Sequence, residues 1–455
     1  MFLETIKSEG LAHLSYVIGS EGCAAVIDPR LDGERYIEVA AAHSCRVTHV
    51  FETHRNEDLL SGAAVLAAHT GATVFHGPNP ADKILYAKTA CEGDAFSIGN
   101  LRIEALETPG HTDDSLSYVL FDTDHPDGAF AVFTGDTLFV GDVGRCDFYP
   151  ERAEEVAGLL FDSLRKLEAL GNHVIVYPAH GAGSVCGSGM ADRDFSTIGH
   201  ERANNPRLRI TDRDEFIAAK LDEHHDYPPY FEQMEALNLR GADAVKRPVA
   251  PPPMTAAAVA ECKDNTVLID VRSASAFLGA HLPESLSLPL GTLSTFAGWF
   301  LSPRDKLILI ADSAADAEVA AVRLARIGYN KIAGYLAPDL AAWAASGSAF
   351  HSLPVLSADD VRERLDEPPP DWTLLDVRGP EEVANARIPD AQHVYLGELP
   401  AKLEQLDTAR KYTLMCGSGT RATIAASLLL RAGFTDPELF LGSLGAWQQR
   451  GFATD

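Results

Sequence analysis

The chain has 455 residues and is strongly acidic, with 65 Asp and Glu against 38 Lys and Arg and a formal net charge of −27. Such a charge repels a phosphate backbone, so the composition argues against nucleic-acid binding. No apolar run reaches the length of a membrane helix, and the first residues lack the charged-then-apolar pattern of an export signal. The seven scattered cysteines form no disulfide framework and fit a reducing cytoplasm. At this length we expect roughly two to four domains.

The first half of the chain alternates apolar, strand-like runs with loops that carry metal-ligand side chains. Residues 13–19 and 24–29 predict a β-hairpin, and residues 46–53 predict a buried strand followed by a helix that starts near residue 61. Loops that follow strands display side chains from a rigid scaffold, so ligands on several of them can converge at one edge of a sandwich. The ligand-type residues on such loops are His54, Asp58, His111, Asp136 and His180.

The motifs around these residues resemble those of the metallo-β-lactamase superfamily, whose usual first pattern is His-x-His-x-Asp-His. Here Asn56 replaces the second His and Leu59 the third. A Leu has no lone pair, and a neutral amide is a poor transition-metal ligand, so a dinuclear zinc centre is not expected. The resemblance implies an αββα sandwich in residues 1–235. It also implies a mononuclear centre, because the superfamily's persulfide dioxygenases use a triad at the positions of His54, His111 and Asp136.

Two imidazoles and one carboxylate make the facial triad of non-haem iron, which leaves coordination positions open. The resemblance therefore implies one Fe(II) per chain. The expected reaction uses O2 to oxidise the sulfane sulfur of a low-molecular-weight thiol persulfide to sulfite. Asp58 and Asp114 are candidates to orient the ligand histidines.

Three further residues are candidates to line the substrate pocket: His180, Arg145 and Cys186. His180 would bind the metal, or it would only line the pocket or form a hydrogen bond. Arg145 lies in a Gly-Arg-x-Asp-Phe segment that resembles one in the persulfide dioxygenases, and it would bind a carboxylate of the thiol; a salt bridge with Asp147 is the alternative. Cys186 would hold sulfur in transit, with an inert thiol as the alternative.

A Pro-rich linker is predicted over residues 236–254, and the sequence after it repeats itself at an offset of about 105 residues. Lys306–Ala311, for example, returns as Lys411–Cys416. Each copy, 255–350 and 351–455, alternates short strands with amphipathic helices, which predicts a parallel-sheet α/β domain. The repeated motifs resemble the rhodanese family. The expected fold class is thus a multidomain α/β and α+β protein.

The second copy carries the rhodanese pattern Cys-x-x-Gly-x-Arg. Its backbone N–H groups and its Arg would stabilise the terminal sulfur of a Cys persulfide. In the first copy Ala311 and Asp316 stand at the positions of the Cys and the Arg, so that copy lacks a nucleophile. It would be a spacer, a docking platform or the surface of a homodimer. The residues of the active loop are Cys416, Gly417, Ser418, Gly419, Thr420 and Arg421.

Together these resemblances imply a persulfide dioxygenase joined to a sulfurtransferase that forms or uses thiosulfate, in sulfide detoxification. Glutathione, coenzyme A or another thiol would carry the persulfide, and the residues do not choose among them. One alternative is a zinc-dependent thioester hydrolase of the glyoxalase II type fused to a sulfurtransferase. The other is a sulfur-carrier or sensing protein without dioxygenase activity.

Overall fold

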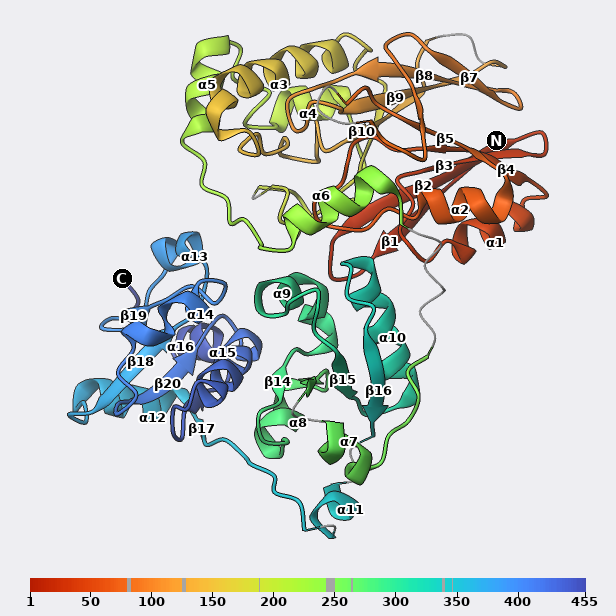
Figure 1. The fold of residues 1–455 in the computed structure, drawn as a ribbon. Helices are drawn as coiled ribbons and strands as arrows, with labels where there is room; N and C mark the ends of the chain where they lie inside the picture. The colour runs from red at the N-terminus through yellow and green to blue at the C-terminus, as the bar shows by residue number, and fades with distance from the viewer. Residues whose placement is uncertain are drawn as a thin grey trace. The chain divides into compact units, whose positions relative to one another are not determined.

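The structure is a computed structural model that describes residues 1–79, 83–124, 128–187, 189–242, 250–262, 265–337, 340–345 and 347–455. The chain divides into two compact units near residue 247 (Figure 1). Of the linker expected over 236–254, residues 243–249 lie outside the described residues, and helix α6 (Phe231–Arg240) occupies its first part. None of the helices in the described ranges combines the length and apolar character needed to cross a bilayer.

The described part of the first unit contains two six-stranded sheets. The first sheet, in the order β1-β2-β3-β4-β5-β6, comprises β1 (Phe2–Ser8), β2 (His13–Ser20), β3 (Cys23–Ile27), β4 (Arg46–Phe51), β5 (Thr73–His76) and β6 (Lys88–Thr89). The second, in the order β12-β11-β10-β9-β8-β7, comprises β7 (Ala95–Ile98), β8 (Leu101–Glu107), β9 (Leu116–Asp122), β10 (Ala131–Gly135), β11 (Ile175–Pro178) and β12 (Ser196–Thr197). The predicted hairpin is confirmed, since β2 and β3 pair antiparallel with Ser20 opposite Cys23.

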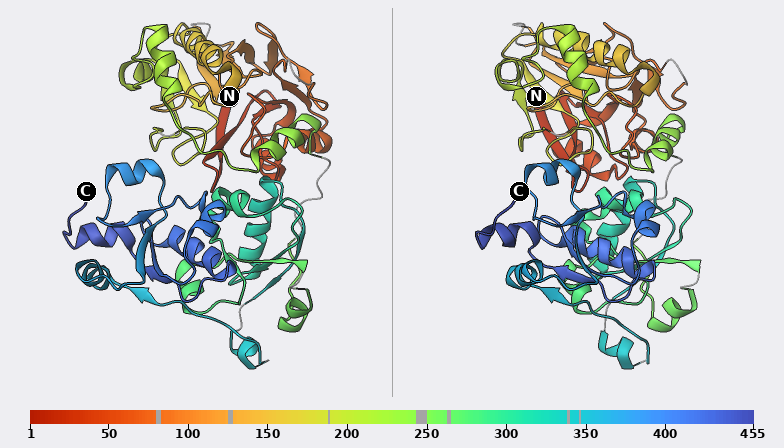
Figure 2. Two further views of the ribbon diagram at one scale, coloured as in Figure 1. Left: turned by 60° about the vertical axis from the view of Figure 1, so that its left-hand side comes forward. Right: turned by 90° about the vertical axis from the view of Figure 1, so that its left-hand side faces the viewer.

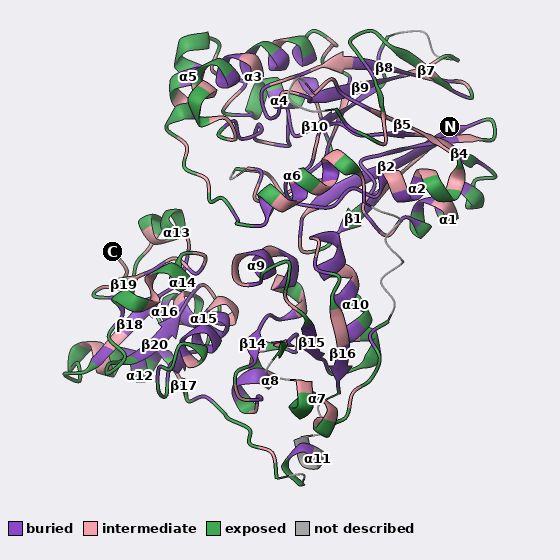
Figure 3. Cartoon of the chain, viewed as in Figure 1, coloured by how far each residue is buried: buried purple, intermediate pink, exposed green. Residues whose placement is uncertain are grey.

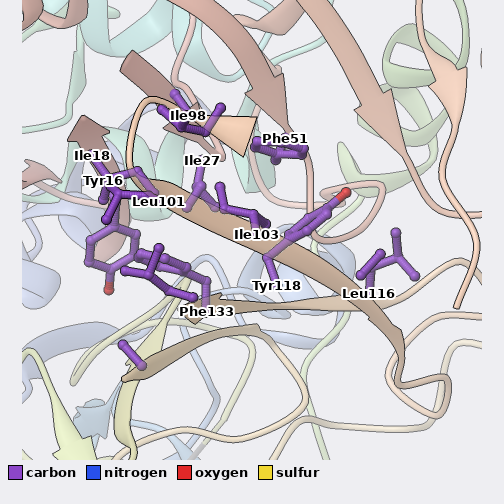
Figure 4. Close-up of a cluster of buried hydrophobic side chains, with 14 of the residues drawn as sticks. Tyr16, Ile18, Ile27, Phe51, Ile98, Leu101, Ile103, Leu116, Tyr118 and Phe133 are labelled. Atoms are coloured by element: carbon purple, nitrogen blue, oxygen red, sulfur yellow. The ribbon is translucent and has the colours of Figure 1, made fainter. Parts of the chain in front are cut away.

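The two sheets of the first unit pack face to face through a shared apolar core (Figure 4). Tyr16 and Ile18 of β2 point into this core, where they meet Ile103 and Phe133 of the second sheet. Val17, between them in sequence, points to the opposite face of β2 and joins another cluster. Alternation with period two is the ordinary geometry of a strand, and it gives each sheet one face for the partner sheet and one for helices.

Helices cover the outer face of each sheet, which completes the αββα sandwich. On the first sheet they are α1 (Glu34–Ala42) and α2 (Ala63–Thr70), and on the second α3 (Ala153–Glu168), α4 (Ile198–Asn204) and α5 (Arg213–Leu221). Two further views show the same layers (Figure 2). The helices expose one face to solvent and bury the other, whereas the strands beneath them are mostly buried (Figure 3). The predicted sandwich is therefore confirmed.

The second unit holds two parallel sheets flanked by helices, in the described residues. The first, in the order β14-β13-β15-β16, comprises β13 (Val267–Asp270), β14 (Leu286–Ser287), β15 (Leu307–Ile310) and β16 (Ile332–Leu336). The second, in the order β17-β21-β20-β18-β19, comprises β17 (Val355–Leu356), β18 (Trp372–Asp376), β19 (Gln392–His393), β20 (Lys411–Met415) and β21 (Glu438–Phe440). The helices of the first copy are α7 (Ala256–Cys262), α8 (Ala274–Gly279), α9 (Leu293–Phe300), α10 (Ala314–Arg326) and α11 (Leu340–Ala345). Those of the second copy are α12 (Ala358–Asp366), α13 (Pro380–Asn385), α14 (Leu399–Lys402), α15 (Thr420–Arg431) and α16 (Ser443–Gln449).

The internal repeat is visible in matching side-chain contacts. Buried Arg272 donates to Asp270 two residues earlier and to the carbonyl of Ala280 eight residues later. Arg378 makes the corresponding bonds to Asp376 and to the carbonyl of Ala386. Each charge-assisted pair joins the end of the first long strand of its copy to the following helix. The expectation of two α/β domains of one kind is confirmed.

Candidate metal centre and cysteine loop

Four strand ends of the first unit bring the candidate ligands together. His54 follows β4, His111 follows β8, Asp136 follows β10 and His180 follows β11. Donor atoms of His54, His111 and Asp136 all lie within 4.8 Å of one another, and the three side chains are buried. The Nε2 atoms of His54 and His111 lie 3.9 and 3.5 Å from Oδ2 of Asp136.

The two histidines direct bare nitrogens into this cluster. Neither His54 Nε2 nor His111 Nε2 has a hydrogen-bond partner of acceptable geometry among the described residues, although both atoms are buried. A buried polar atom without a partner is costly unless a ligand satisfies it. The donor chemistry, two imidazoles and a carboxylate, is that of a transition-metal triad. The residues present therefore fit a single metal ion.

Each ligand histidine is oriented through its other ring nitrogen. Nδ1 of His54 lies 2.9 Å from Oγ1 of Thr53, whose hydroxyl donates to Asp28 at 2.9 Å. Nδ1 of His111 lies 2.8 Å from the carbonyl oxygen of Arg145. An Nδ1–H donated to these acceptors leaves the Nε2 lone pair free for a metal. Burial lowers the pKa of His54, which favours the neutral ligand form. Burial would also lower the pKa of His111, but the Glu57 and Asp136 carboxylates outweigh it and raise that pKa.

The expected orienting residues Asp58 and Asp114 do not contact the ligand histidines through any described hydrogen bond. Asp58 instead lies 3.0 Å from Nε2 of His180, and Asp114 accepts from the Thr112 hydroxyl at 2.6 Å. The Thr53 hydroxyl and the Arg145 carbonyl, instead of the two aspartates, contact the Nδ1 atoms of the ligand histidines. Local sequence could not reveal this, because the Arg145 acceptor is 34 residues from His111 and belongs to the backbone.

His180 contacts carboxylates with both ring nitrogens. Its Nδ1 lies 2.7 and 2.9 Å from the two Asp136 oxygens, and its Nε2 faces Asp58. Burial alone would lower the pKa of His180, but Asp136 and Asp58 raise it well above its ordinary value. Burial would raise the pKa of Asp136, yet His180 and the other histidines hold it below its usual range. His180 therefore holds the Asp136 carboxylate by hydrogen bonds. Of the roles expected for His180, this is the hydrogen-bonding one.

Arg145 makes the salt bridge that was the alternative to substrate binding. Its Nε and Nη2 donate to the Asp147 carboxylate, both at 2.7 Å, and Nη1 donates to the carbonyls of Val185 and Asp226. Its side chain is fully buried. The guanidinium of Arg145 is thus already bonded to acceptors of this chain. These bonds hold Arg145 in place, and its backbone carbonyl accepts from His111 Nδ1.

Cys186 is fully buried, and its thiol donates to Oε1 of Glu57 at 3.5 Å. Burial raises the pKa of this thiol well above its ordinary value, with the carboxylates of Asp136, Asp58 and Glu57 acting in the same direction. A protonated thiol is a poor nucleophile. This environment matches the inert thiol rather than a carrier of sulfur in transit.

Glu57 belongs to the metal-binding loop but was not among the predicted site residues. Its carboxylate is 2% exposed, and Oε1 lies 3.2 Å from His111 Nε2. Burial would raise the pKa of Glu57, but the neighbouring His111 and His54 lower it. The Glu57 carboxylate is a ligand-type group, unlike Arg55 and Asn56, but the loop sequence has no strand periodicity that would assign its side chain an inward direction.

The loop itself is held by a residue far away in sequence. Asn238 of α6 donates from Nδ2 to the carbonyls of Asn56 and Leu59, at 2.6 and 2.8 Å, and accepts from the backbone N–H of Ser61. The Leu59 side chain is buried at 1% exposure. The two positions that depart from the family pattern are therefore built into a fixed loop.

A second cluster of ligand-type side chains adjoins the triad. Donor atoms of Asp58, His180 and Cys186 also lie within 4.8 Å of one another and are buried. An aromatic group borders His111 on another side, with Phe148 at 5.3 Å between ring centroids, and this group continues to Phe231 and to Tyr227, which is 42% exposed.

The cysteine loop of the second unit lies between β20 and α15. The backbone N–H of Gly419 donates to Cys416 Sγ at 3.1 Å, and the N–H of Cys416 donates to the Ser443 hydroxyl. Gly419 has φ of 116°, a conformation that favours glycine. The start of α16 closes the loop, since N–H groups of residues 442, 444 and 445 donate to the carbonyls of Ser418, Cys416 and Gly417. Thr420 begins α15. Among the described residues, one backbone N–H of the loop, that of Gly419, donates to the sulfur.

Arg421 forms an ion pair with Glu382, which was not among the predicted site residues. Its Nη1 and Nη2 donate to the two oxygens of Glu382 in α13, and this bidentate pair raises the pKa of Arg421. Its guanidinium lies beside Gly417, so it is adjacent to the cysteine loop. In the first copy, buried Ala311 occupies the position of the cysteine after β15, and Asp316 lies in the first turn of α10.

Comparisons with known proteins agree with these observations. Residues 9–180 match the metallo-beta-lactamase superfamily, and residues 255–346 and 357–450 each match the rhodanese-like domain. The hydroxyacylglutathione hydrolase of Rhodospirillum rubrum is 34% identical over 160 residues, 35% of this chain and 57% of that protein, so just over half of that relative is matched. A probable metallo-hydrolase of Burkholderia pseudomallei is 30% identical over 246 residues, covering 46% of this chain and 81% of its own length.

The crystal structure of a metallo-beta-lactamase from Staphylococcus aureus extends the similarity. It has a TM-score of 0.67 and 28% identity, covering 74% of this chain and 98% of its own. The aligned region, 74% of the chain, is longer than the first unit and therefore includes part of the second. The chain therefore belongs to the metallo-β-lactamase superfamily, in a form joined to two rhodanese-like domains.

Proposed function

We propose that the protein is an iron-dependent dioxygenase that oxidises the sulfane sulfur of a low-molecular-weight thiol persulfide to sulfite, and that its last domain is a sulfurtransferase. The observation that carries the proposal is the buried set of His54, His111 and Asp136, in which the Nε2 atoms of both imidazoles lack a hydrogen-bond partner of acceptable geometry. A ferrous ion bound there would supply the redox chemistry and the activation of O2. The superfamily's dioxygenases, as the sequence resemblance implies, use the same three motif positions.

The residues of the chain would contribute position and exclusion of water. Thr53 and the Arg145 carbonyl keep the Nδ1 protons of the two histidines, so that each Nε2 remains a ligand. His180 holds the Asp136 carboxylate. The aromatic group from Tyr227 to Phe148 would offer an apolar surface for the substrate's sulfur beside His111.

The Cys416 loop would transfer sulfur by a displacement on sulfur. The Cys416 thiolate attacks the outer sulfur of thiosulfate, the bond between the two thiosulfate sulfurs breaks, and sulfite leaves with the bonding electrons. The outer sulfur remains as a Cys416 persulfide, which the N–H of Gly419 and Arg421 would stabilise, until a second nucleophile takes it. Sulfite links the two activities, since one produces it and the other releases or consumes it.

Oxygen uptake tests the first activity. The iron-loaded protein is expected to consume O2 with glutathione persulfide, and His111→Ala is expected to abolish that uptake. Cys416→Ser is expected to leave oxygen uptake intact and to abolish thiosulfate:cyanide sulfurtransfer. No O2 uptake by a protein with one iron per chain would refute the dioxygenase, and sulfurtransfer that persists in Cys416→Ser would refute the role of the loop.

The second cluster of Asp58, His180 and Cys186 supports another candidate, a zinc-dependent thioester hydrolase. Two of the relatives with hydrolase names also point in this direction. That function needs two metal ions, and Asn56 and Leu59 remove two donors from the loop. Metal analysis separates the two candidates: one iron per chain supports the dioxygenase, whereas two zinc ions with hydrolysis of a hydroxyacylglutathione support the hydrolase.

A further inference from the structure

The geometry points to Glu57 as a fourth protein ligand of the metal ion that His54, His111 and Asp136 would hold. The inference rests on the proposed metal centre and is independent of which reaction that centre performs. It concerns a residue that lies between the departures from the family pattern, Asn56 and Leu59.

Glu57 and Asp136 face the same two ligand nitrogens at matching distances. Glu57 oxygens lie 3.2 Å from His111 Nε2 and 4.0 Å from His54 Nε2. Asp136 Oδ2 lies 3.5 and 3.9 Å from the same two atoms. An ion close enough to both nitrogens and to Asp136 is therefore within reach of the Glu57 carboxylate as well.

The Glu57 carboxylate lacks another cation to pair with in the described structure. Its ion-pair partners there are the two histidines, and Oε2 is buried without a hydrogen-bond partner. The other contact is the Cys186 thiol. Leaving a carboxylate buried with an unsatisfied oxygen is costly, and a divalent cation removes that cost.

A second grouping of donor atoms leads to the same residue. Glu57, Asp136 and Cys186 offer donor atoms within 4.8 Å of one another, so Glu57 adjoins Asp136 as well as the histidines. The loop of residues 54–59, which lacks two of the family's imidazoles, thus supplies the Glu57 carboxylate to the site. The resulting donor set, two nitrogens and two carboxylates, has more oxygen character than the triad alone.

Metal affinity of the full-length, metal-free protein tests the inference without any substrate. Anaerobic titration with Co(II) and Fe(II) against a competing chelator gives the affinity, and the visible Co(II) absorption reports the coordination. Loss of an outer hydrogen-bonding partner lowers affinity by about 10–100-fold. For Glu57→Gln we expect more than about 100-fold loss together with a changed Co(II) spectrum. Glu57→Asp, which keeps the charge on a shorter arm, is expected to lose less affinity but to change the spectrum too.

A control variant separates ligation from charge. Glu235→Gln removes a nearby carboxylate that pairs with Arg55 instead of the histidines. It is expected to keep the affinity within about threefold, a change of about 0.7 kcal/mol. Glu57→Gln with a loss below about 100-fold, or with an unchanged Co(II) spectrum, overturns the inference. His111→Ala that retains metal would overturn the triad itself, and so the two failures are distinguishable.

Discussion

Replacing Thr53 with Val tests how the chain sets the state of His54. Val has nearly the shape of Thr but removes the hydroxyl that accepts from His54 Nδ1 and donates to Asp28. At 1% exposure, Thr53 admits little water to replace the lost bonds. His54 then lacks an acceptor for its Nδ1 proton and can rotate or change tautomer. Outer partners of this kind contribute about 10–100-fold in metal affinity, or about 1.4–2.7 kcal/mol.

The assay is the same anaerobic Co(II) titration of metal-free, full-length protein. Thr53→Ser keeps the hydroxyl and is expected to stay within about threefold of the unmodified protein. Thr423→Val is a matched control, because the buried Thr423 hydroxyl donates to the Gly419 carbonyl in the second unit. Equal affinity for Thr53→Val and the unmodified protein would refute the role of this hydroxyl in orienting His54.

Three further outcomes are expected. Glu382→Gln should free Arg421 from its carboxylate partner and lower the KM for thiosulfate in steady-state sulfurtransfer; an unchanged KM would show that the pair does not limit anion binding. Arg145→Met should lower the free energy of unfolding by about 1–2 kcal/mol, because a fully buried donor is lost while its carboxylate partner Asp147 is 40% exposed and can be hydrated; normal thermal stability with a raised KM for persulfide would instead indicate substrate binding. Burial raises the pKa of Asp28 to about 7, so the folded state of the metal-free protein binds a proton that the unfolded state releases, and stability should fall as pH rises from about 4 to 7. Asp28→Asn should flatten that part of the pH profile of urea unfolding, and an identical profile would contradict the raised pKa.

Much of the fold could be read from local patterns. The alternation of Tyr16 and Ile18 with Val17 between the two faces of β2 follows from strand geometry, and the repeat of Asp270-x-Arg272 as Asp376-x-Arg378 marks two copies of one domain. The three ligand residues were likewise predictable as a group. Each follows an apolar strand, and strand ends in a sandwich share an edge.

The partners of those ligands depended on contacts between distant parts of the chain. Arg145 was a candidate for the substrate, but its fork meets Asp147, and its carbonyl receives His111. His180 faces two carboxylates instead of an open pocket. Hydrogen bonds between loops depend on the direction of each side chain after packing, and loop sequences carry no periodicity that encodes this direction.

The sequence by itself determined the order of domains, the strand ends that carry ligands, and which rhodanese-like copy has a cysteine. Only the tertiary structure decided that Glu57 faces the two bare histidine nitrogens and that Glu382 pairs with Arg421. The physical reason is that residue spacing specifies position along a strand or helix. The convergence of charges from separate loops arises only when the sheets and helices pack.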